Sequence, residues 1–292
     1  MPIYFLLALS VLFWSGNFIF GRYAHDAIDP LTLNLFRWGT VALILLPYIY
    51  SKRDIITKAM KKDFGILLLL AALGIAGFNT ALYTGLQYTS ATNALLINSS
   101  IPVLIVLFNS EKITLRQMVG ILFSTVGVIY LVLKGEVNNL TELNFNQGDL
   151  WIIITSIIWA LYSILIKKRP TYLSSFEFLA TISMLGFGLL LLSFYLFGHH
   201  LSYKTFYFDS EIYSIILYMA IFPSLLSFYF WNRGLVEIGA NKTGQFTHLM
   251  PIFGAILAVV FLGEEIHFYH FVGMCLIGFG IYLSIFLGKT ST

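Results

Sequence analysis

The sequence predicts an all-α membrane protein with ten transmembrane helices in two inverted five-helix repeats. Of the 292 residues, 58% are hydrophobic and only 11% are charged, against about 25% charged in a soluble domain. The apolar residues fall in blocks of roughly 20, the length that crosses a hydrocarbon core. Finally, the order of landmark residues in the first half recurs in the second half.

Ten apolar blocks bounded by polar clusters give the expected spans. In chain order they cover residues 3–21, 31–50, 64–83, 90–108, 115–133, 149–166, 174–197, 212–231, 242–262 and 268–287. The first block lacks a basic leader and a small-residue cleavage site, so we interpret it as a retained helix rather than a signal peptide. The single cysteine, Cys275, forms neither an intramolecular disulfide nor a cysteine-based metal cluster.

Basic side chains gather in alternate connections between these spans, and Arg37 lies inside one. One side of the membrane holds thirteen, namely Lys52, Arg53, Lys58, Lys61, Lys62, Lys112, Arg116, Lys167, Lys168, Arg169, Arg233, Lys242 and Lys289. The other side holds three, Arg22, Lys134 and Lys204. The positive-inside rule then predicts a multi-pass protein of a bacterial cell (inner) membrane with both termini cytoplasmic. The distribution explains the net charge of +3, so we expect no nucleic-acid partner.

The most basic connection, residues 51–63, is interpreted as a loop that sets the topology, with a lipid- or partner-binding patch as the alternative.

An internal repeat relates the two halves. Trp14 matches Trp159 at an offset of 145, Gly85 and Pro102 match Gly234 and Pro251 at 149, and Glu111, Gly120 and Gly127 match Glu264, Gly273 and Gly280 at 153. The last jump predicts that the fourth span lacks about one helical turn that the ninth has. We assign residues 1–134 to the first five-helix repeat, 135–148 to a periplasmic linker and 149–292 to the second repeat.

Because each repeat has an odd number of spans, the second must enter the membrane from the opposite face. This inverted arrangement is typical of secondary transporters, which bind solute near the midplane between the repeats.

Several short motifs, in this order, resemble those of the EamA family of the drug/metabolite transporter superfamily. They are Trp14-Ser15-Gly16-Asn17, Arg37, Tyr88-Thr89-Ser90-Ala91, Trp231-Asn232-Arg233-Gly234, Met250-Pro251-Ile252-Phe253 and Gly263-Glu264-Glu265. The resemblance covers nearly the whole chain. It implies a ten-helix fold, a cavity lined mainly by helices 1, 3, 4, 6, 8 and 9, and export or exchange of amino acids, aromatic metabolites or other small organic compounds. Two features depart from the family pattern: Asn109-Ser110 precedes Glu111 in place of glycine, and His248 stands in the ninth span.

Aromatic and polar residues at related positions are candidates for the cavity wall. Trp14 and Asn17 in the first span correspond to Trp159 and Tyr162 in the sixth. Their rings beside amide and hydroxyl groups would suit an amphipathic solute or a cation, and helix packing is the alternative.

The fourth and ninth spans each carry a proline, Pro102 and Pro251, which frees a backbone carbonyl and kinks the helix. We interpret both as helix-kink or gating residues, with Asn98 beside the first break as a cavity residue. Gln245 and His248 share a helix face near the second break. A titratable group inside the membrane is a candidate for solute binding or for carrying a coupling proton, and a neutral histidine bonded between helices is the alternative.

Further polar candidates lie in the second, third and eighth spans. Asn79 and Tyr83 share a face of the third span, and we expect Tyr229 of the eighth to join them as a cavity residue, with interhelical hydrogen bonding as the alternative. Arg37 lies roughly 9 Å deep at 1.5 Å per residue. Its side chain either snorkels to the interface in a structural role or reaches an anionic solute.

These features favour a secondary transporter or exporter of a small organic solute over a passive channel or an intramembrane enzyme. The sequence has no Walker motif, no HExxH motif and no charged ring or filter loop. We therefore expect no enzyme activity, no cofactor and no metal site. The expected partners are the solute, membrane lipid and a coupling proton, and the sequence leaves the oligomeric state open.

Overall fold

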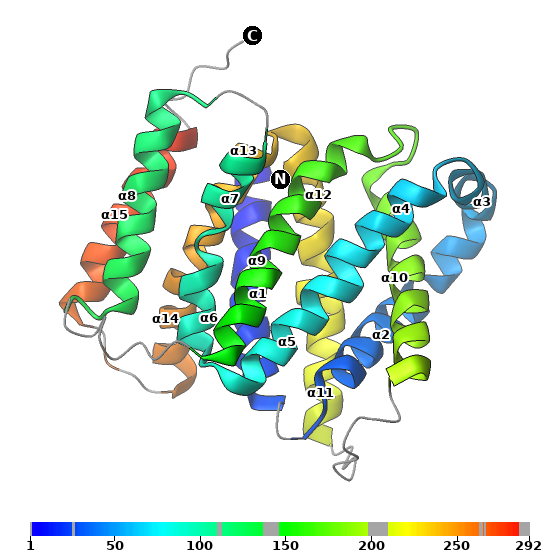
Figure 1. Cartoon of the computed structure of the whole chain (residues 1–292), viewed down its shortest axis with the longest axis horizontal. Coiled ribbons are helices and arrows are strands. Elements are labelled where there is room, and N and C mark those ends of the chain that lie inside the picture. Colours follow the sequence, from blue (N-terminus) through cyan, green and yellow to red (C-terminus); the bar gives the residue numbers. More distant parts are fainter. Residues whose placement is uncertain are drawn as a thin grey trace.

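The computed structural model describes residues 2–24, 27–109, 113–136, 146–197, 210–262, 265 and 267–285. Within these ranges the chain forms helices and no strands. Eight of the helices are long and apolar enough to cross a membrane, and Figure 1 shows them packed side by side. The chain is therefore an all-α membrane protein, as the composition predicted. Glu111, Glu264, His199 and His200 lie outside the described residues.

The helices of the first half follow one another with few interruptions. They are α1 (Ile3–Tyr23), α2 (Pro30–Ser51), α3 (Arg53–Lys62), α4 (Phe64–Ala71), a π-helical turn (Ala72–Gly77), α5 (Phe78–Tyr88), α6 (Ala91–Asn98), α7 (Ile101–Phe108) and α8 (Leu115–Val132). The segment α4–π–α5 forms one span over residues 64–88.

The second half repeats much of this order. Its helices are α9 (Gln147–Leu165), a 3₁₀ turn (Ile166–Lys168), α10 (Ser175–Phe197), α11 (Ser210–Met219), a π-helical segment (Ala220–Leu226), α12 (Ser227–Glu237), α13 (Ala240–Gly244), a 3₁₀ segment (Gln245–Leu249), α14 (Met250–Leu262) and α15 (Phe268–Ile285). The segment α11–π–α12 forms one span over residues 210–237.

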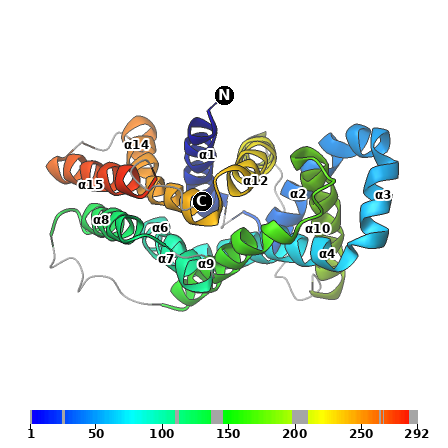
Figure 2. The same ribbon diagram turned by 90° about the horizontal axis from the view of Figure 1, so that it is seen from above.

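The basic connection after α2 is a helix, α3, and not the expected loop. Its apolar residues Ile56 and Ala59 are buried, while the basic residues Lys58, Lys61 and Lys62 lie on its exposed side. A basic amphipathic helix is typical of a segment that lies along a membrane surface. Figures 1 and 2 place α3 at one edge of the molecule, opposite α8 and α15.

The expected fourth and ninth spans depart from regular α-helix next to each proline, where residues 99–100 form a turn and Gln245–Leu249 form a 3₁₀ segment. Pro102 is the second residue of α7, and Pro251 is the second residue of α14. Proline is tolerated in the first turn, where its missing N–H has no helical acceptor. Ser99, Ser100, Gln245 and Met250 keep right-handed helical backbone angles. The interpretation of Pro102 and Pro251 as helix-kink or gating residues therefore stays a prediction. Beyond its proline α14 runs to Leu262, whereas α7 ends at Phe108, which agrees with the predicted missing turn.

The third and eighth spans each contain a π-helical segment, which the sequence analysis did not anticipate. The two segments, Ala72–Gly77 and Ala220–Leu226, correspond closely under the repeat offset of 149. A π-helical turn often lies at a functional site, because it widens the helix and re-aims the surrounding side chains.

Close helix contacts recur in the two halves with their partners exchanged. α5 packs on α9, and α12 packs on α1. A Cβ at Gly85 of α5 would lie 2.6 Å from Ile152 of α9, and a Cβ at Gly234 of α12 would lie 2.6 Å from Leu7 of α1. Gly85 and Gly234 are related by the offset of 149, and Leu7 and Ile152 by 145.

Helices α8 and α15 lie at the edge of the bundle in Figure 2 and pack on each other through glycines. Cβ atoms built on Gly120 and Gly280 would each lie 2.5 Å from the other residue's carbonyl oxygen. Gly127 lies 3.3 Å from a Cβ built on Gly273, which repeats the contact at the related positions. The small residues thus let the two helix backbones meet directly.

Candidate functional site

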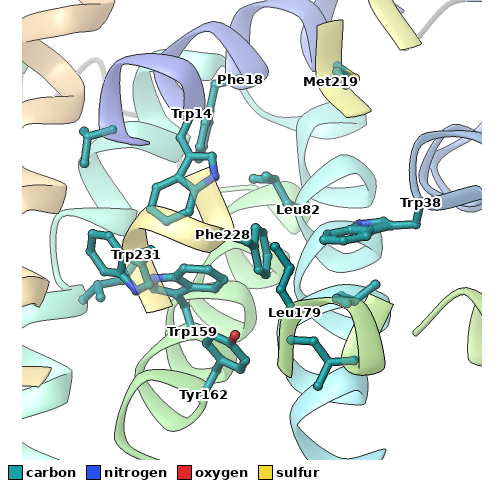
Figure 3. Packing of buried hydrophobic residues seen from close by; sticks show 14 of the residues in the cluster. Trp14, Phe18, Trp38, Leu82, Trp159, Tyr162, Leu179, Met219, Phe228 and Trp231 are labelled. Carbon is teal, nitrogen blue, oxygen red and sulfur yellow. The ribbon is translucent and has the colours of Figure 1, made fainter. Parts of the chain in front are cut away.

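The centre of the bundle holds a cluster of indole rings. Trp14 of α1 contacts Trp159 of α9 and Trp231 of α12, with ring centroids 5.1 and 4.9 Å apart. Figure 3 shows the three rings converging from three helices. The indole N–H of Trp14 donates to the carbonyl oxygen of Pro223 at 2.8 Å, in the π-helical segment of the eighth span. The rings therefore join helices of both halves.

A small enclosed cavity lies beside these rings. Its volume is about 10 Å³, roughly enough for one water molecule. The lining residues are Trp14, Asn17, Phe18, Phe78, Asn79, Asn98, Ile101, Trp159 and Met250. Five of these nine are residues that the sequence analysis proposed for the cavity wall. A cavity of this size does not accommodate an organic molecule.

Arg37 is fully buried and points into the bundle, not toward the membrane surface. Its Nε donates to the hydroxyl of Ser224 at 2.5 Å. Its Nη1 donates to the amide oxygens of Asn79 and Asn17 at 2.8 and 3.1 Å and to the hydroxyl of Tyr83. The expectation that this side chain snorkels is wrong, because the acceptors on α1, α5 and the eighth span draw it inward.

The acceptors of Arg37 are all neutral. Within the described part of the chain, no carboxylate lies within ion-pair distance of the guanidinium, and the ion pairs there are Arg53–Asp54 and Arg233–Glu237. A buried charge costs several kcal/mol unless it is hydrogen-bonded and paired. The four hydrogen bonds offset part of this cost, and the positive charge itself stays unpaired.

The same hydrogen bond occurs in both halves with its residue types exchanged. In the first half the hydroxyl of Tyr83 donates to the amide oxygen of Asn17 at 2.8 Å. In the second half the hydroxyl of Tyr162 donates to the amide oxygen of Asn232, also at 2.8 Å. Asn17 corresponds to Tyr162 at the offset of 145, and Tyr83 corresponds to Asn232 at 149. The two halves therefore preserve the contact while differing at both of its positions.

Two amides near the helix breaks have unused hydrogen-bonding groups. The side chain of Asn98 accepts from Ser156 at 2.9 Å, and its buried Nδ2 has no partner. Both amide atoms of Gln245 are buried without partners. Leaving a buried polar group unsatisfied costs about 1–3 kcal/mol. These groups therefore have hydrogen-bonding capacity left for a water molecule or a ligand.

His248 bridges three helical segments. Its Nε2 lies 2.8 Å from the carbonyl oxygen of Ser99, at the break between α6 and α7, and its Nδ1 lies 2.7 Å from the hydroxyl of Ser124 on α8. Because a carbonyl only accepts, Nε2 carries a proton. His248 does not line the cavity, and both of its ring nitrogens are engaged by protein atoms.

Tyr229 does not line the cavity, and neither do the other proposed wall residues Tyr83, Tyr162 and Gln245. The ring of Tyr229 packs on Phe176 of α10 with centroids 5.7 Å apart, so it does not join Asn79 and Tyr83. The sequence analysis did not propose Trp231, Asn232 or Ser224 as site residues. The repeat could have identified Asn232, because this residue occupies the position that corresponds to Tyr83.

Among the residues with described positions, no group of three histidine, cysteine, aspartate or glutamate side chains could hold a metal ion.

One family model matches most of the chain. The model of the EamA-like transporter family matches residues 1–133 and 146–286. The Bacillus subtilis protein "Uncharacterized transporter YyaM" is 28% identical over 288 residues, which covers 96% of this chain and 92% of that protein. An "Uncharacterized transporter" of Archaeoglobus fulgidus is 27% identical over 287 residues, which covers 96% of each protein.

A solved structure described as "Crystal structure of protein" has the same fold, with a TM-score of 0.77. It is 17% identical and covers 98% of this chain and 96% of its own.

Proposed function

The chain belongs to the EamA-like transporter family, and we propose that it moves a small organic solute across the cell (inner) membrane by alternating access. In this proposal ten spans form two inverted five-helix halves with both termini cytoplasmic, and the fourth and ninth spans are kinked at Pro102 and Pro251. The solute is an amino acid or an aromatic or amine-type metabolite. The names of the relatives point to a transporter rather than an enzyme.

The observation that carries this proposal is the recurrence of equivalent contacts within and between the two halves. The Tyr83–Asn17 hydrogen bond within the first half corresponds to Tyr162–Asn232 within the second. The contact of Gly85 of α5 with α9 corresponds to the contact of Gly234 of α12 with α1, and both of these join the halves. Two halves with equivalent contacts can exchange conformations at little cost in free energy, which is the basis of alternating access in inverted-repeat transporters.

The closed cavity supports a carrier over a channel. Its volume of about 10 Å³ excludes an organic solute until the halves move. The irregular turns next to the prolines supply points where such motion is localised, because residues 99–100 and Gln245–Leu249 lie outside regular α-helix.

We further propose that the coupling ion is a proton and that His248 carries it. In the neutral form of His248, the Ser124 hydroxyl donates to Nδ1. In the charged form Nδ1 donates, and the Ser124 hydroxyl can turn to the carbonyl oxygen of Gly120, which lies 2.9 Å away. Protonation therefore reverses one hydrogen bond between α8 and the ninth span without leaving a donor unpaired.

Counterflow into liposomes tests the transporter function. A panel of labelled amino acids, aromatic acids and amines is offered outside, with the same unlabelled compound inside. We expect saturable uptake of at least one compound, stimulated by its internal pool. Uptake that never saturates would support a channel, and chemical conversion of the compound would support an enzyme.

The pH dependence of the same uptake tests the coupling proposal. We expect uptake by the parent to vary between pH 5 and 8 and His248→Gln to remove that variation, because glutamine does not titrate. His267→Gln, which changes an exposed histidine, is the control and retains it. Uptake by the parent that is independent of pH would contradict coupling through His248.

A further inference from the structure

We propose that the solute carries a carboxylate that binds Arg37 and an apolar body that lies against the indole rings of Trp14 and Trp159. This inference rests on the proposed transporter function and specifies the chemical class of its solute. It follows from the charge of Arg37, from the donors around the cavity and from the positions of the acidic residues.

Arg37 has hydrogen-bonding capacity left. A guanidinium has five N–H donors, and the four hydrogen bonds of Arg37 use Nε and Nη1. In the described part of the chain, Nη2 donates to no protein acceptor. A carboxylate oxygen is the acceptor that a guanidinium binds best, in both charge and geometry. A carboxylate would also neutralise the charge that the neutral acceptors leave unpaired.

Two amide side chains of the cavity wall are hydrogen-bonded to Arg37. Asn17 and Asn79 line the cavity, and their amide oxygens both accept from Arg37. Arg37 therefore lies one side chain behind the wall. Since a guanidinium only donates, the oxygen of Asn17 must face Arg37, and this fixes the orientation of its amide. The Nδ2 of Asn17 makes no hydrogen bond within the described residues.

The unused groups at or next to the wall are donors. Asn17 and Asn98 line the cavity, the Nδ2 of Asn98 has no partner, and Arg37 lies directly behind Asn17. A group that fits here brings oxygen acceptors. A carboxylate brings two oxygens with about four acceptor sites, enough for all three donors.

The acidic residues disfavour a cationic solute. Every Asp and Glu whose position is described lies at the end of a membrane helix, in α3 or in a connection. These residues are Asp29, Asp54, Asp63, Glu136, Asp149, Glu177, Glu211, Glu237 and Glu265. None of the residues that line the cavity is acidic. An ammonium group there would meet the charge of Arg37 and find no counter-ion on the wall.

The apolar part of the solute has a matching wall. The lining also includes the rings of Phe78 and Trp159, with centroids 4.5 Å apart, and that of Trp14. Aromatic faces hold flat or compact apolar groups by burial and offset packing. The site therefore joins a donor-rich end to an apolar end, which suits a monocarboxylate with an aromatic-sized body.

Three compounds that share a phenylethyl group and differ only in the polar group test the preference for a carboxylate directly. They are 3-phenylpropionate, 3-phenylpropionamide and 3-phenylpropylamine. Binding to the purified chain at pH 7 is measured by calorimetry and by fluorescence of the tryptophans. We expect the carboxylate to bind about tenfold or more tightly than the amide, as hydrogen bonds to charged groups predict, and the amine to bind more weakly than either. Equal binding of carboxylate and amide, or tighter binding of the amine, would overturn the inference.

Two variants test whether the preference for carboxylate over amide depends on Arg37. Asn17→Asp keeps the acceptor that faces Arg37 and supplies a built-in carboxylate. We therefore expect a folded protein whose preference for carboxylate over amide is lost. Arg37→Gln should lose the same preference by removing the charge, whereas Arg53→Gln, which removes a charge on exposed α3, should retain it. A preference that survives in Asn17→Asp would count against Arg37 as the anion site, even if Arg37→Gln does not fold.

Exchange in liposomes separates this inference from the proposed function. If 3-phenylpropylamine binds more tightly than the carboxylate and is exchanged, the chain is a transporter and the carboxylate inference fails. If the carboxylate binds in an Arg37-dependent manner without being moved in either direction, the binding site stands and transport of this class fails.

Discussion

The two tyrosines related by the repeat, Tyr83 and Tyr162, should contribute unequally to the free energy of unfolding. Considering charge alone, Tyr83 should contribute more to the free energy of unfolding than Tyr162, because its hydroxyl accepts a hydrogen bond from the charged Arg37. A hydrogen bond to a charged group contributes about 1.5–3 kcal/mol, against about 1 kcal/mol for a neutral one. The partners that remain after each substitution reverse this order.

Tyr83→Phe leaves the surrounding groups satisfied. The two hydrogens of Arg37 Nη1 keep two acceptors, the amide oxygens of Asn17 and Asn79. We therefore expect a loss of about 1 kcal/mol, the net contribution of one hydrogen bond.

Tyr162→Phe leaves Asn232 buried with no partner at either end, because its Nδ2 is already unpartnered. A stranded buried group costs about 1–3 kcal/mol, so we expect a loss of about 2 kcal/mol. Replacing both partners with apolar groups should recover most of this loss, since the desolvated amide is then absent. The double variant Tyr162→Phe with Asn232→Leu should therefore be more stable than Tyr162→Phe alone.

Reversible unfolding in mixed detergent micelles measures these differences. Tyr195→Phe is the matched control, because this side chain is 74% exposed and its change should stay within about 0.5 kcal/mol. The reasoning is refuted if Tyr83→Phe costs as much as Tyr162→Phe, or if Asn232→Leu adds its own loss to that of Tyr162→Phe.

Two further predictions concern the helices around the site. Gly120→Ala should lower thermal stability, because its Cβ would lie 2.5 Å from the Gly280 carbonyl oxygen and overpacking costs about 1–3 kcal/mol. Gly278→Ala is the control, because nothing lies within 4 Å of its new Cβ. It should gain up to about 1 kcal/mol of stability from helix propensity. Equal melting temperatures for the two variants would contradict the α8–α15 contact. Pro102→Ala restores a backbone N–H and should join α6 to α7, so counterflow should slow while the melting temperature holds or rises, and faster counterflow would argue against gating at this break.

The sequence predicts the membrane class and the central residues because both leave a one-dimensional pattern. Apolar blocks of span length reveal the helices, and the offset between Trp14 and Trp159 identifies two rings that meet at the centre. Asn17, Asn79 and Asn98 are polar residues inside apolar blocks, so they stand out without coordinates. All three line the cavity.

The remaining features of the site depend on the direction of each side chain and on local helix geometry. A single sequence does not contain this information. Arg37 is drawn inward by Ser224, a residue 187 positions away. Tyr229 faces α10, although its position along the eighth span resembles that of a wall residue. The π-helical segments have no side-chain signature, and proline predicts a disturbed helix without deciding between a kink and a break.

Access to the cavity from both sides of the membrane tests the central claim most directly. The single natural cysteine, Cys275, is exposed, so Cys275→Ser gives a background in which Ile101→Cys places one thiol in the cavity wall. A membrane-impermeant thiol reagent is applied from either side of sealed vesicles, with and without 3-phenylpropionate on the opposite side. We predict labelling from each side, with the two rates changed in opposite directions by the compound. Labelling from one side only, or equal changes on both sides, would contradict alternating access.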